Sequence, residues 1–164
     1  MRRTKSGIRA AVVAAVVLGG AIGLAPGAGA VTPTTATATY NCGIWGNGSA
    51  TLVATESTDS TSATITLSTA ITSPIAIGAN TLSADLALTL NGGATQVHFT
   101  GSSNPAIAAG GAVTVGPLTG TVASGESLDS YITTGSAYSL SVLYLGVTVT
   151  CQATTSQSPG PFVF

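Results

Sequence analysis

The stretch Thr81-Leu-Ser-Ala-Asp-Leu-Ala-Leu-Thr-Leu90 decides the fold class of this chain, because its residues alternate in polarity. Leucine or alanine occupies every even position, whereas all but one of the odd positions carry a polar residue. A period of two is typical of a half-buried β-strand, with a leucine row in the core and Asp85 in solvent. The following Asn91-Gly92-Gly93 supplies residues that tolerate positive φ. We therefore predict a hairpin turn and a returning strand over 95–100.

A second alternating pair lies near the C-terminus, over 138–145 and 147–151, with Gly146 between the two segments. The second segment places Cys151 on the same face as two valines, so we expect its side chain to point inward. Weaker strands are predicted over 50–55, 63–68, 73–77 and 112–119. No window shows helical periodicity. We predict an all-β chain, a single immunoglobulin-like β-sandwich of about seven to nine strands, with a small β-barrel as the alternative.

The two cysteines of the chain, Cys42 and Cys151, bracket most of this domain. An even cysteine count in a secreted protein indicates a disulfide, and two cysteines allow only one pairing. A metal site would need more ligands than two cysteines and the single histidine supply. We therefore expect a disulfide between Cys42 and Cys151 and no metal site.

The first thirty residues have the three parts of a secretory signal. Basic residues lie within positions 2–9, an apolar run follows over 10–24, and Ala28-Gly29-Ala30 offers a cleavage site. The apolar run is shorter than the roughly 20 residues that cross a bilayer. We predict a cleaved signal peptide at 1–30, a Thr/Ala/Pro-rich lead-in at 31–39, the β-domain at 40–155 and a flexible tail at 156–164. The lead-in is either a short linker or a frayed edge strand. The expected location is extracellular or at the cell wall.

Charge excludes several classes of partner. Residues 31–164 contain no lysine or arginine, five acidic residues and one histidine. Nucleic-acid binding requires cationic side chains that neutralise phosphates, so we exclude it. Attraction to anionic lipid fails for the same reason, and no membrane partner is expected after signal cleavage.

Candidate catalytic residues are sparse. A Ser–His–acid triad would have to use His98, which shares its predicted strand face with polar residues, and no Gly-x-Ser-x-Gly motif is present. Two acidic pairs, Glu56 with Asp59 and Glu126 with Asp129, have a spacing that could serve glycoside hydrolysis or calcium binding. The chain has few aromatics to hold a sugar and no calcium-loop motif. We expect solvated loop acids, no cofactor and no catalytic centre.

Trp45 allows two interpretations. A tryptophan three residues after Cys42 is expected to pack over the disulfide in the core. The alternative is an exposed ligand platform that Trp45 forms with Tyr131.

The opening Ala38-Thr39-Tyr40-Asn41-Cys42 and the closing Val147-Thr148-Val149-Thr150-Cys151 frame strands rich in Gly, Thr and Val, with an Ala/Gly-rich signal before them. In these features the chain resembles small secreted β-sandwich proteins of actinobacteria, a group of unknown function. The resemblance implies a secreted immunoglobulin-like fold, and it transfers no activity and no catalytic residue.

These observations predict a non-catalytic secreted or cell-surface protein with a structural or interaction role. The alternative is a module that binds a carbohydrate or a small apolar ligand at a face near Trp45. Candidate partners are a cell-wall glycan, a protein, or a second copy of the chain, since its strand edges carry no protective lysines.

Overall fold

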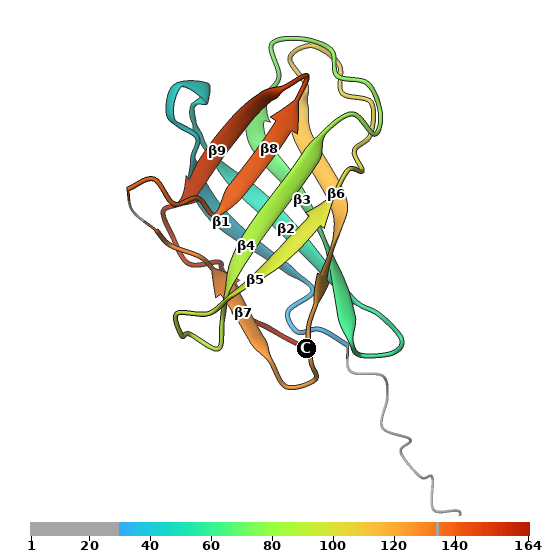
Figure 1. The fold of residues 1–164 in the computed structure, drawn as a ribbon, viewed down its shortest axis with the longest axis vertical. Coiled ribbons are helices and arrows are strands. Elements are labelled where there is room, and N and C mark those ends of the chain that lie inside the picture. Colours follow the sequence, from blue (N-terminus) through green and yellow to red (C-terminus); the bar gives the residue numbers. More distant parts are fainter. Residues whose placement is uncertain (1–29, 134) are drawn as a thin grey trace, which may run out of the picture.

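The computed structural model describes residues 30–133 and 135–164, and Figure 1 shows them as one antiparallel β-structure. The predicted signal peptide falls almost entirely on residues 1–29, outside the described residues. The described chain forms ten strands and one 3₁₀ turn, η1. The elements are β1 (Thr35–Asn41), η1 (Gly43–Trp45), β2 (Asn47–Glu56), β3 (Ser62–Thr72), β4 (Ser83–Leu90), β5 (Gln96–Gly101), β6 (Ala112–Thr121), β7 (Ser127–Ser130), β8 (Leu140–Tyr144), β9 (Val147–Ala153) and β10 (Phe162–Val163).

Eight of the strands form a barrel in the order β4-β5-β6-β3-β2-β1-β9-β8, and the pairing of the last strand, β8, with the first, β4, closes it. One edge of β4 is paired with β5 along most of its length. Its other edge is divided, because Ser83–Leu86 pair with β8 whereas Leu88–Leu90 pair with β7. β10 then pairs with β7. β7 and β10 thus extend the sheet at one end of the barrel.

The all-β prediction is confirmed, and the architecture fits the small barrel given as the alternative. The prediction of an immunoglobulin-like sandwich is corrected. A sandwich needs two separate sheets, whereas this sheet closes on itself through β4 and β8. Alternation of inward and outward side chains is the same in both architectures. The sequence pattern could therefore find the strands without distinguishing the two folds.

The hairpin predicted from the opening stretch is confirmed. β4 and β5 pair in register from Ala84 to Thr89, and Asn91 adopts a φ of 51° in the turn between them. Leu86 and Leu88 are fully buried, as the alternation predicts. The C-terminal hairpin of β8 and β9 is also present, and Cys151 points into the barrel.

One predicted strand, 73–77, is a loop instead. Within it only Ile77 makes a β-type bridge, to Ile107 in the loop between β5 and β6. The segment contains Pro74, which has no amide to donate to a ladder. These two loops lie together at the end of the barrel that also carries η1 and the β8–β9 turn (Figure 1).

The predicted tail belongs to the folded domain, which corrects its assignment as a flexible segment, and most of β1 falls in the predicted lead-in. β1 begins at Thr35, and Ala36 and Ala38 are buried within it. At the other terminus Phe162 and Phe164 are buried, with ring centroids 6.5 Å apart in an edge-on arrangement. Burial of two aromatic rings outweighs the turn-forming composition of the segment before them.

The end of the barrel nearest the C-terminus is tightly packed, and we call it the closed end. Phe99 of β5 lies directly against Gly120 of β6, where an added Cβ would come within 2.8–2.9 Å of the ring. Phe162 from β10 packs into the same continuous core as Leu128 and Phe99. Large buried side chains therefore pack against one another at the closed end.

Candidate functional site

The opposite end, which we call the open end, contains a cavity of about 460 Å³. Residues of β1, β2, β3, β6, β8 and β9 form its walls, and η1, the 73–77 loop and the β8–β9 turn surround its mouth. Residues lining the walls include Cys42, Gly48, Thr69, Ile71, Leu82, Val113, Leu140, Val142, Tyr144, Val149 and Cys151. This volume falls within the range of about 300–1,000 Å³ that is typical of small-molecule sites.

The cavity is apolar and carries no ionisable group other than two tyrosine phenols. No acid, histidine, lysine or arginine is among its lining residues. Two of its hydroxyls are occupied by the chain itself. The Thr69 hydroxyl lies 3.0 Å from the Ile71 carbonyl oxygen and 3.2 Å from that of Val113, and the Ser73 hydroxyl donates to the Ile75 carbonyl at 2.7 Å. Little hydrogen-bonding capacity therefore remains on these walls for a polar ligand.

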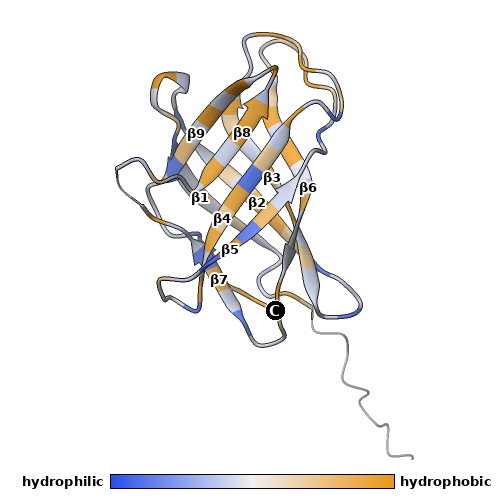
Figure 2. Cartoon of the chain, viewed as in Figure 1, coloured by the Kyte–Doolittle hydropathy of each residue, from blue (hydrophilic) through white to orange (hydrophobic). Residues whose placement is uncertain are grey.

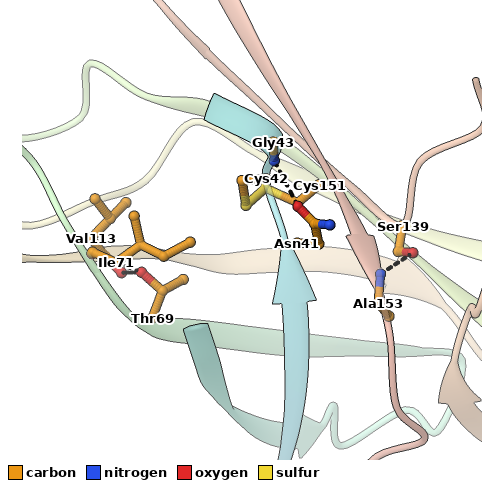
Figure 3. The surroundings of a disulfide bond; sticks show 9 residues. All are labelled: Asn41, Cys42, Gly43, Thr69, Ile71, Val113, Ser139, Cys151 and Ala153. Carbon is orange, nitrogen blue, oxygen red and sulfur yellow. Dashed lines mark hydrogen bonds between the residues drawn. A yellow bond between two sulfur atoms is a disulfide. The ribbon is translucent and has the colours of Figure 1, made fainter. Parts of the chain in front are cut away.

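The predicted disulfide forms part of the wall. Cys42, which directly follows β1, is bonded to Cys151 in β9. Figure 3 shows this bond together with Ile71 and Val113, which also line the cavity. β1 and β9 pair through only two residue pairs, whereas β1 and β2 pair through seven. The disulfide therefore reinforces a short seam of the barrel beside the cavity mouth.

Tyr40 forms part of the cavity lining, and its side chain is almost completely buried. Burial raises the pKa of the Tyr40 phenol, while the neighbouring Ser130 hydroxyl opposes the shift. The Tyr40 phenol thus stays neutral throughout the physiological pH range and adds no charge to the cavity.

Asn104 holds the two long loops of the open end together. Its side-chain amide donates to the carbonyls of Gly78 and Pro105, at 2.8 and 2.7 Å. Its side-chain oxygen accepts from the backbone amides of Thr81 and Leu82, at 2.8 and 2.9 Å. All four bonds are made by one buried side chain. The Asn104 side chain therefore adds to the backbone bridge between Ile77 and Ile107 in fixing the loop that carries Ile75 to the mouth.

Trp45 lies at the mouth of this cavity, and 47% of its surface is exposed. The expectation that it packs as a core residue over the sulfurs is therefore wrong. Trp45 belongs to η1, a single turn outside the barrel that contains no buried residue. Its side chain therefore contributes to the cavity lining and is also exposed to solvent. Tyr131, its predicted companion in a platform, is partly buried and does not line the cavity.

His98 and Asp85 lie on the outer wall of the barrel, as their strand positions predict. Their contact was not predicted from the sequence, yet His98 Nδ1 lies 2.8 Å from an Asp85 carboxylate oxygen. The pair is diagonal across the β4–β5 register, a distance that side chains of this length can span. No serine hydroxyl is hydrogen-bonded to His98 within the described part of the chain.

Three of the four paired acids, Asp59, Glu126 and Asp129, accept hydrogen bonds from the chain itself. The Asp59 carboxylate accepts from the Ser57 hydroxyl and from the Thr61 amide, and these bonds hold its pKa below the usual range. Glu126 accepts from the Ala123 amide at 2.7 Å. Asp129 accepts from the amides of Ser130 and Gln157, at 2.6 and 3.0 Å. Among residues 30–133 and 135–164 no three acidic, histidine or cysteine side chains gather as a metal site.

The cavity itself was missed from the sequence. Its inward-facing residues, such as Val142 and Val149, have the same alternation as a filled core. The one indication in the sequence is the position of the large side chains, because none of the three phenylalanines of the chain lines the cavity. That placement depends on which ends of the strands come together, which the alternation does not specify.

Comparison of the chain with protein-family models, curated proteins and solved structures found no match. The resemblance to actinobacterial secreted proteins therefore stays a prediction. The part of the chain that the structure describes has no helix of the length and apolarity required to span a membrane.

Proposed function

We propose that this protein is a non-catalytic binding module that holds a small apolar ligand in the open end of its barrel. The observation that carries the proposal is the cavity of about 460 Å³, whose walls contain no charged side chain. Removal of apolar ligand surface from water supplies the driving force, about 25 cal/mol for each Å² buried. Closed barrels are a common architecture for such sites, because strands at one end can leave the interior unfilled.

The chemistry of the walls favours an apolar ligand over a carbohydrate. A sugar carries many hydroxyls, and each hydroxyl buried without a partner costs free energy. The hydroxyls of Thr69 and Ser73 are already bonded to backbone carbonyls. A carboxylate buried here would also lack a cation, because residues 31–164 contain no lysine or arginine. The ligand that fits is thus uncharged, or places its charged group outside the mouth.

The site of action that we propose is outside the cytoplasm. The disulfide between Cys42 and Cys151 supports this location, because such bonds persist in oxidising compartments. The signal pattern of residues 1–30 points the same way. A structural role, the first expectation from the sequence, gives no account of an apolar cavity with an open mouth.

A neutral fluorescent probe, N-phenyl-1-naphthylamine, tests the proposal. We expect saturable binding of one probe per chain by the wild-type protein. Val142→Phe adds a ring inside the cavity, and we expect it to weaken binding by about tenfold or more. Val53→Phe is the matched control, since Val53 lies on the outer face of β2 and is exposed. Equal affinity in both variants, or no saturable binding by the wild type, would refute the proposal.

A further inference from the structure

The mouth of the cavity is surrounded by exposed apolar side chains. We call this set the apolar rim and define it as Ile44, Trp45, Ile75, Leu145 and Val147. Four of the five line the cavity, and the fifth, Ile44, precedes Trp45 in η1. Ile44 is 97% exposed and Leu145 is 81% exposed. Figure 2 shows apolar residues on the loops at this end of the barrel, opposite the C-terminus.

The rim consists of separate tips rather than one flat patch. Ile44 and Trp45 belong to the η1 turn, Ile75 to the loop after β3, and Leu145 to the tight turn between β8 and β9. A protein partner would need a complementary surface with a pocket for each protruding side chain. A lipid surface adapts to protruding side chains without such a match. Trp45 and Tyr144 at this end also have the amphipathic rings that favour a membrane–water interface.

The two ends of the molecule differ in their content of charged residues. Glu56 and Asp59 lie at the β2–β3 turn, Glu126 and Asp129 lie in and beside β7, and all four are at the closed end. Asp85 lies on the outer wall of β4. The rim and the cavity walls carry no acid and no base. The open end can therefore approach an uncharged surface without desolvating a charge, whereas an anionic surface offers it no attraction.

From these observations we propose that the apolar rim docks on an uncharged, zwitterionic lipid bilayer, with the cavity mouth facing the lipid. The inference rests on the proposed function, since the same orientation would let an apolar ligand pass between bilayer and cavity without crossing water. It departs from the expectation that the protein has no membrane partner. That expectation considered charge alone, and no charge is needed when apolar tips enter the interface.

The test uses the protein without residues 1–30 and vesicles of phosphatidylcholine. We expect the wild-type protein to float with the vesicles and the emission of Trp45 to shift to shorter wavelength. Ile44→Ser/Leu145→Ser removes the two most exposed tips and should reduce vesicle binding by about tenfold or more. Val53→Ser/Val163→Ser, at exposed apolar positions outside the rim, is the matched control and should bind vesicles as the wild type does.

Two further readouts separate this inference from the function on which it rests. Ile44→Ser alone changes a rim residue that does not line the cavity, so it should weaken vesicle binding and leave binding of the naphthylamine probe unchanged. Val142→Phe should instead still bind vesicles. Addition of anionic phosphatidylglycerol should not strengthen binding, and salt should not weaken it. Probe binding without vesicle binding would overturn the docking inference alone. A concentration-dependent dimer that the rim variant abolishes, with no vesicle binding, would assign the rim to a second copy of the chain instead.

Discussion

The two ends of this barrel differ in how their interior is filled. At the closed end, Phe99, Phe162 and Phe164 occupy the interior and its edge. At the open end, valines, a glycine and a disulfide surround a cavity. The closed end is thus held by packing, whereas the open end is held by a covalent bond and by the hydrogen bonds of Asn104. A barrel can keep a binding space when other interactions replace the missing core.

Removal of the disulfide should give the largest effect. Cys42→Ala/Cys151→Ala opens a loop with a sequence separation of 109 residues. The chain-entropy relation then gives a loss of about 4–5 kcal/mol in the free energy of unfolding. Denaturant titration of the variant against the oxidised wild type measures this loss. A change below about 1 kcal/mol would show that the open end does not depend on the bond.

Truncation of inward-facing side chains should distinguish the two ends. Phe162→Ala creates a void in a filled region and should cost about 3–5 kcal/mol. Val149→Ala enlarges a space that already exists, so it should cost only about 1 kcal/mol. The same denaturant titration compares the two. Similar losses at both positions would argue that the open end is packed as tightly as the closed end.

Two glycines provide a finer comparison. Gly120→Ala would bring a Cβ against the Phe99 ring, which is confined on all sides by the core, and should cost about 1–3 kcal/mol. At the mouth, the Cβ of Gly48→Ala would meet the Ile71 side chain at 3.1 Å. Ile71 can move toward the cavity, so the cost should be smaller. Thermal unfolding of both variants tests the order, and a greater loss for Gly48→Ala would contradict it.

The smallest effect concerns acid at the closed end. The folded pKa of Asp59 is lowered, so its contribution to stability is present above the unfolded pKa of about 3.8 and is lost as pH falls through the folded value. Ser57→Ala removes a donor to this carboxylate, and NMR titration should then show the pKa of Asp59 rising toward 3.8. The difference in the free energy of unfolding between wild type and variant should shrink as the pH falls through the folded pKa of Asp59. An unchanged Asp59 pKa would show that the Ser57 hydroxyl does not stabilise the charge.

Local features of this fold could be predicted from the sequence, and those that depend on closure could not. Alternation over 81–90 located β4 and the side of it that faces the core, because that pattern is a property of one strand. Whether β4 pairs with β8 depends on contacts between segments more than fifty residues apart. The barrel and the cavity inside it follow from that pairing. The burial of Phe162 and Phe164 was missed for the same reason, since the closed end into which they pack exists only after closure.

Energy transfer from Trp45 to N-phenyl-1-naphthylamine tests the central claim most directly, because Trp45 is the only tryptophan and lies at the cavity mouth. A bound ligand in the open end must lie close to its indole ring. We predict that the probe quenches Trp45 emission and gains sensitised emission, with both signals saturating at one probe per chain. Saturable probe binding that leaves Trp45 emission unchanged would place the ligand elsewhere and contradict the account.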